Sequence, residues 1–391
     1  MKRIAAFLLA SVAIQSIGAQ SFIQSYKDRA DIVSQANITT NLQEFAGLGV
    51  KKTGTVANTN ASDWIRNKYL SYGYTASSIT EDTFPYGSAS SKNLIITKTG
   101  TLYPDKYVII CGHYDTIVGP GVSDNGSGTS IILEAARILK DVPTEYSIKF
   151  IHFSGEEQGL VGSTHYVNNV AYEGSTRKLD IKLVLNIDQV GGLIGNTNNK
   201  ITCERDTGGV SSNNAASNTA TQELMTCTSL YSPLQTNLSY AYSSDYMPFE
   251  AKGYTITGFY EYERSENEHT VNDTFANIDP VYVFNVGKAA VGALQHFAVA
   301  STVNALLGTK VSSKPAENIR IYPNPAKDVL KVEFSQKVKQ FKVEISDMAG
   351  NLVLNSENQD TINTSGLQNG VYTVTIKTDR ENTTKKLIIG K

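Results

Sequence analysis

The sequence lacks the features that mark several classes of protein. Only three cysteines occur in 391 residues, too few for a domain held together mainly by disulfides. A formal net charge of −2 provides no excess of positive charge for binding nucleic acid. Beyond the first residues, no apolar run reaches the roughly 18 residues that a membrane-spanning helix needs. We therefore expect a protein with a hydrophobic core, no nucleic acid partner and no transmembrane anchor.

The first residues have the pattern of an export signal. Lys2 and Arg3 precede an apolar stretch that ends in small residues. A basic start, a short apolar segment and a small-residue end are the parts of a secretory signal peptide. The sequence thus predicts a signal peptide over residues 1–19 and export of the mature chain. Export would permit a disulfide between Cys203 and Cys227, and the sequence leaves open whether it forms.

Residues 20–305 alternate between strand and helix patterns. Continuous apolar runs, typical of buried strands, occupy residues 93–97, 107–111, 147–153, 182–187 and 255–260. Helices are expected over residues 25–35 and 62–72, from about residue 127 onward, and over residues 281–303, whereas residues 195–219 read as a long polar excursion. Strands that alternate with helices predict an α/β fold, an α/β/α sandwich with a largely parallel sheet.

The composition changes near residue 306. Residues 306–318 form a small polar linker, and residues 319–391 contain short runs of alternating apolar and polar residues. These runs lie at residues 329–334, 341–345, 371–376 and 386–389, with turn residues between them. This pattern predicts a small C-terminal antiparallel β-sandwich without helices.

Side chains that bind metals or carry protons cluster where the predicted strands end. They are His113, Asp115, Asp124, Glu156, Glu157, Asp188 and His269. Because ligands of open α/β sheets bind at the carboxyl ends of the strands, we expect these side chains to lie together. Imidazole and carboxylate groups are typical ligands of Zn²⁺.

Five of these residues can hold two Zn²⁺ ions if one carboxylate is shared. His113 and Asp188 would bind one ion, Glu157 and His269 the other, and Asp124 both, so each ion keeps an open position for water.

The other two residues have different expected roles. Asp115 is placed to orient the imidazole of His113. Glu156 can take a proton from the bridging water and deliver it to the leaving amine.

The motifs around these residues, taken together, resemble the M28 family of cocatalytic zinc peptidases. They are GHYD at residue 112, SDNGSG at 123, GEEQGLVGS at 155, NID at 186, SDYMPF at 244 and HTVNDT at 269. The resemblance covers residues 25–303 and implies a mixed sheet and the metal and catalytic roles given above. Many relatives have histidine where this chain has Tyr246, which we expect to affect the pocket. The family's oxyanion-stabilising tyrosine corresponds to Tyr240 or Tyr242.

Residues 319–391 look like the type A sorting domain of the type IX secretion system. The matching pieces are IYPNP at residue 321, SDMAG at 346, QNGVY at 368 and the end KKLIIGK. The resemblance implies secretion, or display on the outer cell surface, after export through the periplasm, with the secretion machinery as partner. A carbohydrate-binding or adhesion sandwich is the alternative.

The leading hypothesis is an aminopeptidase that acts on peptides with a free N-terminus. A carboxypeptidase would need a basic residue such as Arg205 or Arg264, but acids outnumber Arg264 around His269. A glutaminyl cyclase of related fold would use one zinc ion, and a non-catalytic surface binding protein should have lost ligands or Glu156. The preferred N-terminal residue, the oligomeric state, the native metal and removal of the C-terminal domain stay open.

Overall fold

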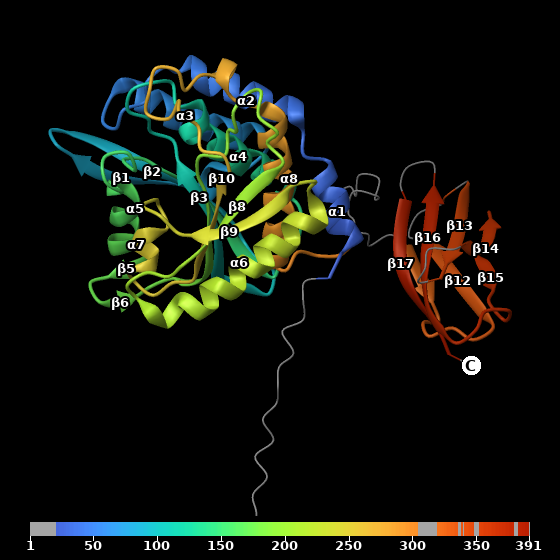
Figure 1. The fold of residues 1–391 in the computed structure, drawn as a ribbon. Coiled ribbons are helices and arrows are strands. Elements are labelled where there is room, and N and C mark those ends of the chain that lie inside the picture. The colour runs from blue at the N-terminus through green and yellow to red at the C-terminus, as the bar shows by residue number, and fades with distance from the viewer. Residues whose placement is uncertain are drawn as a thin grey trace, which may run out of the picture. The chain divides into compact units, whose positions relative to one another are not determined.

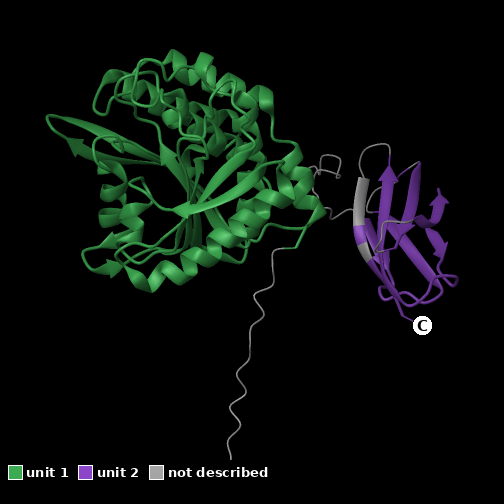
Figure 2. Ribbon diagram, viewed as in Figure 1, with its two compact units in different colours: residues 1–303 green, residues 304–391 purple. Residues whose placement is uncertain are grey.

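The computed structural model describes residues 21–303, 319–334, 338, 340–347, 352–378 and 382–390. The predicted signal peptide and linker lie outside the described residues. The chain forms two compact units, residues 1–303 and 304–391 (Figure 2). Among the described residues, none of the helices is both long enough and apolar enough to cross a membrane.

The first unit is built on an eight-stranded sheet in the order β1-β2-β4-β3-β7-β10-β8-β9 (Figure 1). The strands are β1 Ile79–Tyr86, β2 Ala89–Lys98, β3 Tyr103–His113, β4 Tyr146–Phe153, β7 Asp180–Ile187, β8 Lys200–Arg205, β9 Gln235–Tyr240 and β10 Ile256–Glu261. The central strands β4, β3, β7 and β10 run parallel, β9 is parallel to β8, and the pairs β1–β2, β2–β4 and β8–β10 are antiparallel. This confirms the predicted α/β fold with a mixed, largely parallel sheet.

Helices cover both faces of this sheet. The larger core lies under α1 Gln24–Asp31, α2 Gln35–Gly47, α3 Val56–Ser71, α4 Gly128–Leu139, α6 Ser211–Tyr231 and α8 Pro280–Phe297. The smaller core lies under α5 Val161–Tyr166, the turn Val167–Ala171 and α7 Met247–Glu250. A hairpin of β5 Tyr172–Glu173 and β6 Thr176–Arg177 lies outside the main sheet.

The sequence of β3 shows why the sheet is covered on both sides. Val108 and Ile110 belong to the larger core, whereas Ile109 and Cys111 belong to the smaller one. Alternate residues of a strand point to opposite faces, so a continuous apolar run supplies both cores. Each such buried side chain contributes about 1.5–3 kcal/mol. The strand thereby holds His113, its last residue, at a fixed place at the carboxyl end of the central strands.

The predicted N-terminal helix over residues 25–35 is wrong at its end. Helix α1 ends at Asp31, and α2, which the sequence did not predict, begins at Gln35. The hydroxyl of Ser34 accepts a hydrogen bond from the backbone N–H of Asn37 at 3.2 Å. This is the N-cap that separates the two helices.

The predicted polar excursion over residues 195–219 is also wrong, because it contains β8 and the first half of α6. Helix α6 has a buried face that includes Ser217, Thr221 and Thr228, and their hydroxyls bond to backbone carbonyls. A buried face with hydroxyls satisfied in this way gives no clear apolar period in the sequence. Strand β9 was missed as well, and α8 ends at Phe297 rather than near residue 303.

The cysteines are free and buried. Cys203 lies in β8 and Cys227 in α6, and both belong to the larger core as reduced thiols. The disulfide that the sequence left open is therefore absent from the described residues.

The second unit contains two antiparallel sheets around one core, as the sequence predicted. One sheet has β11 Ile319–Tyr322, β12 Val329–Phe334 and β15 Thr361–Asn363, and the other has β14 Leu352–Glu357, β13 Phe341–Ser346, β16 Gly370–Thr378 and β17 Asn382–Ile389. Leu330 and Val332 of the first sheet and Val343 and Ile376 of the second belong to the same buried cluster. The alternating pattern of the strands places these side chains inside.

Candidate metal centre

The carboxyl ends of neighbouring parallel strands bring the predicted site residues to one edge of the sheet. His113 ends β3, Asp188 follows β7, and Glu156 and Glu157 follow β4. Strand β3 lies between β4 and β7, so these three segments meet. This edge is where an open α/β sheet binds its ligands.

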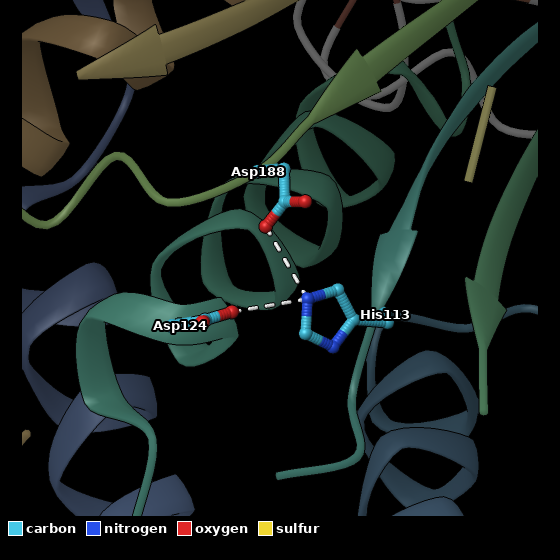
Figure 3. Close-up of side chains that lie close together, drawn as sticks. All are labelled: His113, Asp124 and Asp188. Atoms are coloured by element: carbon cyan, nitrogen blue, oxygen red, sulfur yellow. Dashed lines mark ion pairs between the residues drawn. The ribbon is translucent and has the colours of Figure 1, made fainter. Parts of the chain in front are cut away.

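A first group of three side chains is buried at this edge. The Nε2 atom of His113 lies 3.1 Å from Oδ1 of Asp124 and 3.3 Å from Oδ1 of Asp188 (Figure 3). The ligand atoms of all three lie close enough together to hold one metal ion.

A second group shares Asp124 with the first. The Nε2 atom of His269 lies 3.0 Å from Oδ2 of Asp124 and 3.0 Å from Oε2 of Glu157. Asp124 thus turns one oxygen toward each group. His269 has a φ of 54°, an uncommon left-handed conformation for a residue with a side chain. The structure therefore brings together all five side chains that the sequence nominates as metal ligands, in the nominated groups.

The imidazole of His113 is oriented by a main-chain contact. Its Nδ1 atom lies 3.1 Å from the carbonyl oxygen of Asp115. A carbonyl can only accept, so Nδ1 carries the proton and the lone pair of Nε2 faces Asp124 and Asp188. This is the tautomer that a metal ligand requires.

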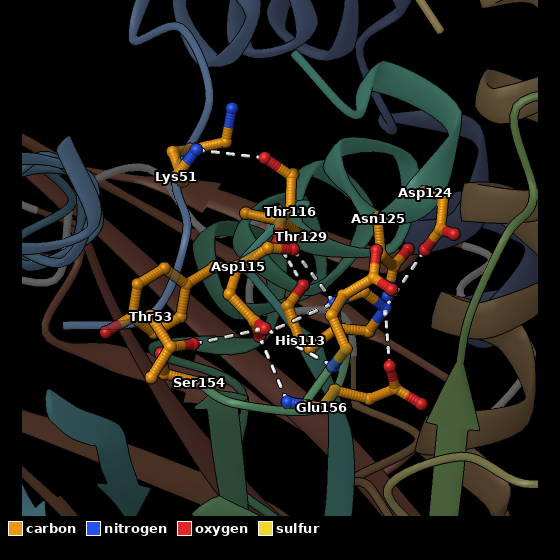
Figure 4. Close-up of polar contacts among 12 residues, drawn as sticks. Lys51, Thr53, His113, Asp115, Thr116, Asp124, Asn125, Thr129, Ser154 and Glu156 are labelled. Carbon is orange, nitrogen blue, oxygen red and sulfur yellow. Dashed lines mark hydrogen bonds and ion pairs between the residues drawn. The ribbon is translucent and has the colours of Figure 1, made fainter. Parts of the chain in front are cut away.

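The carboxylate of Asp115 lies beside the imidazole and also contacts the turn after β4. It lies 3.6 Å from Nδ1 of His113, and it accepts hydrogen bonds from the backbone N–H groups of Glu156 and Glu157, each at 3.3 Å (Figure 4). The hydroxyl of Thr53 donates to it at 3.3 Å. The carboxylate therefore fixes the turn that carries the two glutamates, and the carbonyl of the same residue orients the imidazole.

Glu156 lies beside the first group. Its Oε2 atom is 4.0 Å from Nε2 of His113. Burial raises the pKa of Glu156 to about 10, and the Asp188 carboxylate adds to the shift.

The donor set fits divalent cations. Asp188 has one oxygen, Oδ1, that is buried without a hydrogen-bond partner among the described residues. Its other oxygen accepts hydrogen bonds from the hydroxyls of Tyr242 at 2.9 Å and Ser244 at 2.6 Å. An unpaired buried carboxylate oxygen that faces an imidazole lone pair is costly unless a cation lies between them.

Asp273 supports the centre, and the sequence assigned it no role. Its carboxylate accepts hydrogen bonds from the backbone N–H groups of Ser123 at 2.7 Å and Asp124 at 2.9 Å. It thereby holds the loop that carries the shared ligand. The signal that could have pointed to it is its place in the motif HTVNDT, four residues after His269.

A cleft of about 560 Å³ opens beside the centre and is lined by residues of β8, β9 and β10 and by the loop before His269. Tyr242 lines it and bonds to Asp188, whereas Tyr240 is 58% exposed at its rim. Arg264 also lines the cleft and pairs with Glu268. Glu261, the last residue of β10, also lines the cleft; it is buried and accepts hydrogen bonds from the backbone N–H groups of Gly192 and Ser265.

Two sequence families match the chain. Residues 93–293 match the profile described as Peptidase family M28, and residues 320–390 match that of the Secretion system C-terminal sorting domain. Aminopeptidase YwaD of Bacillus subtilis is 41% identical over 108 residues, which are 27% of this chain and 23% of that protein. The chain thus spans less than a quarter of the length of this curated relative.

Solved structures share the fold of the first unit. The LapA aminopeptidase of Legionella pneumophila has a TM-score of 0.61 and 20% identity, over 76% of this chain and 80% of that one. A glutaminyl cyclase of Macrostomum lignano has a TM-score of 0.60 and 13% identity, over 71% of this chain and 94% of that one. The fold alone therefore does not separate these two activities.

Proposed function

Because the chain belongs to peptidase family M28, we propose that it is an exported metallo-aminopeptidase that uses two Zn²⁺ ions. The proposed ligands are His113, Asp124, Glu157, Asp188 and His269. The observation that carries the proposal is the position of Asp124, whose two oxygens face different imidazoles at 3.1 Å and 3.0 Å. A carboxylate placed in this way can bridge two cations.

The chemistry would divide between the ions and the chain. Bound at the two groups, the ions would supply an activated water and polarise the carbonyl of the scissile peptide bond. Cations at the two groups would lower the pKa of Glu156 and keep it ionised. Glu156 would then act as the general base that accepts the proton of the attacking water, and next as the acid that delivers it to the leaving amine. Asp115 supports both steps, since its carboxylate holds the backbone of Glu156 in place.

Of the two tyrosines that the sequence left open, Tyr242 is better suited to stabilise the oxyanion. Its hydroxyl lies at the centre, 2.9 Å from Asp188, whereas Tyr240 is largely exposed and lies against Arg205. A donor that is fixed and shielded from water stabilises developing negative charge more than an exposed one.

The charge of the cleft supports recognition of a free N-terminus. Among the described residues that line it, the one arginine, Arg264, already pairs with Glu268, so it is not free to bind the terminal carboxylate of a substrate. An ammonium group is therefore favoured over a terminal carboxylate. This disfavours a carboxypeptidase. A glutaminyl cyclase with one zinc ion would not account for the second group at Glu157 and His269.

The sorting domain implies secretion or attachment at the cell surface. We propose that the type IX secretion machinery recognises it, after export through the periplasm.

The test is hydrolysis of two kinds of substrate by the zinc-loaded protein. Aminoacyl-p-nitroanilides, which have a free N-terminus, should be cleaved. Peptides with a blocked N-terminus and a free C-terminal carboxylate should not be cleaved. Treatment with a chelator should abolish the activity and added zinc should restore it. Release from the N-blocked peptides alone would refute the aminopeptidase assignment, and cyclisation of N-terminal glutamine would favour the cyclase.

A further inference from the structure

Glu204 is a buried acid in the wall of the cleft. It lies in β8, is 2% exposed, and lines the cleft beside the candidate metal centre. The hydroxyl of Tyr246 donates a hydrogen bond to its Oε2 atom at 2.7 Å. Glu204 has no part in the proposed chemistry, so its burial needs another explanation.

This carboxyl has no positive partner in the described part of the chain. Burial raises the pKa of Glu204 to about 8; the hydrogen bond from Tyr246 lowers it and the Asp188 carboxylate raises it, with no contribution from lysine or arginine. A buried carboxyl without a cation is costly to ionise, and a cation from a ligand would offset that cost.

The two arginines nearest to the cleft are engaged elsewhere. Arg264 pairs with Glu268. Arg205, the neighbour of Glu204 in sequence, donates to Asn218 at 3.1 Å and lies over the ring of Tyr240. Adjacent residues of a strand point to opposite faces, so the charge of Arg205 is directed away from Glu204.

The surroundings of Glu204 are closely packed on the side of β10 and polar on the side of the cleft. Its partner on β10 is Gly258, where an added Cβ would lie 3.0 Å from Oε2 of Glu204 and 2.9 Å from the ring of Tyr246. The cleft wall nearby is supplied by Thr202, Asn237 and Ser239, all of them polar. A wall of this kind suits a long side chain with a charged end better than an aliphatic one.

We propose that Glu204 determines specificity by binding the protonated side chain of an N-terminal lysine or arginine. This inference rests on the proposed aminopeptidase function and adds to it the class of substrate. The methylene groups of the substrate residue lie along the cleft wall, and its cationic end pairs with Glu204. Apolar N-terminal residues of the same length leave the carboxyl without its cation and are cleaved less efficiently.

The test compares lysyl- and norleucyl-p-nitroanilide, which share a linear four-carbon side chain and differ in the terminal ammonium. A hydrogen bond to a charged group is worth about 10- to 100-fold, so kcat/KM should be higher for the lysyl substrate by that factor. Glu204→Gln keeps an oxygen for Tyr246 and removes the charge, and should bring the ratio close to one. Glu263→Gln is the matched control, because Glu263 binds Asn196 outside the cleft. It should keep the wild-type ratio.

Two kinetic outcomes overturn the inference. A wild-type preference for the norleucyl substrate would do so. So would an equal loss on both substrates in Glu204→Gln, which would mean that Glu204 only supports Tyr246. If neither substrate is cleaved, the aminopeptidase proposal itself fails. Calorimetry of the zinc-loaded protein with lysinamide and norleucinamide then decides separately: tighter binding of lysinamide that is lost in Glu204→Gln supports the role of Glu204, and equal binding contradicts it.

Discussion

The substitution Asp273→Asn tests how the shared ligand is held. The carboxylate of Asp273 accepts hydrogen bonds from the N–H groups of Ser123 and Asp124 at 2.7 and 2.9 Å, and its carbonyl accepts one from Val122 at 3.3 Å. Asparagine keeps one side-chain oxygen and turns an amide NH₂ toward the other N–H group. The loop that carries Asp124 then loses one of the three hydrogen bonds that it donates to Asp273.

We expect effects of similar size on metal binding and on the fold. A buried N–H left without an acceptor costs about 1–3 kcal/mol of stability. Loss of a group that orients a metal ligand typically lowers metal affinity or activity by about 10- to 100-fold. Because Asp124 faces both groups, we expect Asp273→Asn to weaken zinc binding at both sites by this factor.

Zinc affinity is measured by competition with a chelating dye, beside urea unfolding of the same protein. The assay is run at pH 8, since burial raises the pKa of Asp273 to about 6 and the wild-type carboxyl is then ionised. Asp279→Ala is the control: Asp279 caps α8 by accepting from the N–H of Val281 at 2.9 Å. Loss of this cap should cost about 1 kcal/mol and leave zinc affinity unchanged. Wild-type zinc affinity in Asp273→Asn would refute the reasoning.

Three other predictions concern the glutamate pair, acid stability and the C-terminal unit. Glu156→Gln should keep the metal and lower kcat by about 10²–10⁴-fold, whereas Glu157→Gln should lose metal and regain activity in excess zinc. Metal content and kcat are measured for both variants. Loss of metal in Glu156→Gln, with the metal kept in Glu157→Gln, would mean that the two roles are reversed. Burial lowers the pKa of His152 to about 3 from the usual 6.5, so between these values the unfolded chain binds a proton that the folded chain does not. In this pH range, the free energy of unfolding should fall by about 1.4 kcal/mol for each unit by which the pH is lowered. His152→Gln should make the midpoint of urea unfolding depend less on pH, and a dependence equal to that of the wild type would contradict this. Deletion of residues 319–391 should leave peptidase activity intact and stop release to the medium; a folded but inactive truncation would mean that both units form the site.

The strands and their terminal residues were predictable from the sequence for a physical reason. A strand buried on both faces must be apolar throughout, so β3 and β7 stand out as continuous runs, and the polar residues His113 and Asp188 mark their ends. The grouping of the candidate ligands then follows from the meeting of parallel strands at one edge of the sheet.

The parts that the sequence did not reveal depend on contacts between distant segments. Helix α6 buries hydroxyl groups that bond within the fold, so its pattern resembles a polar loop. The expectation for Asp115 used its side chain, but the backbone of the same residue lies closer to His113. The choice between Tyr240 and Tyr242 depends on where the chain leaves β9, which periodicity does not give.

Metal analysis of the purified protein tests the central claim most directly. Zinc per chain is measured by mass spectrometry after dialysis for the wild type, His269→Ala and Asp124→Ala, each beside activity on an aminoacyl substrate. A centre of two ions that share Asp124 predicts two zinc ions per wild-type chain, fewer than two in His269→Ala, and loss of both in Asp124→Ala together with activity. One zinc ion per chain that survives His269→Ala with full activity would contradict the account.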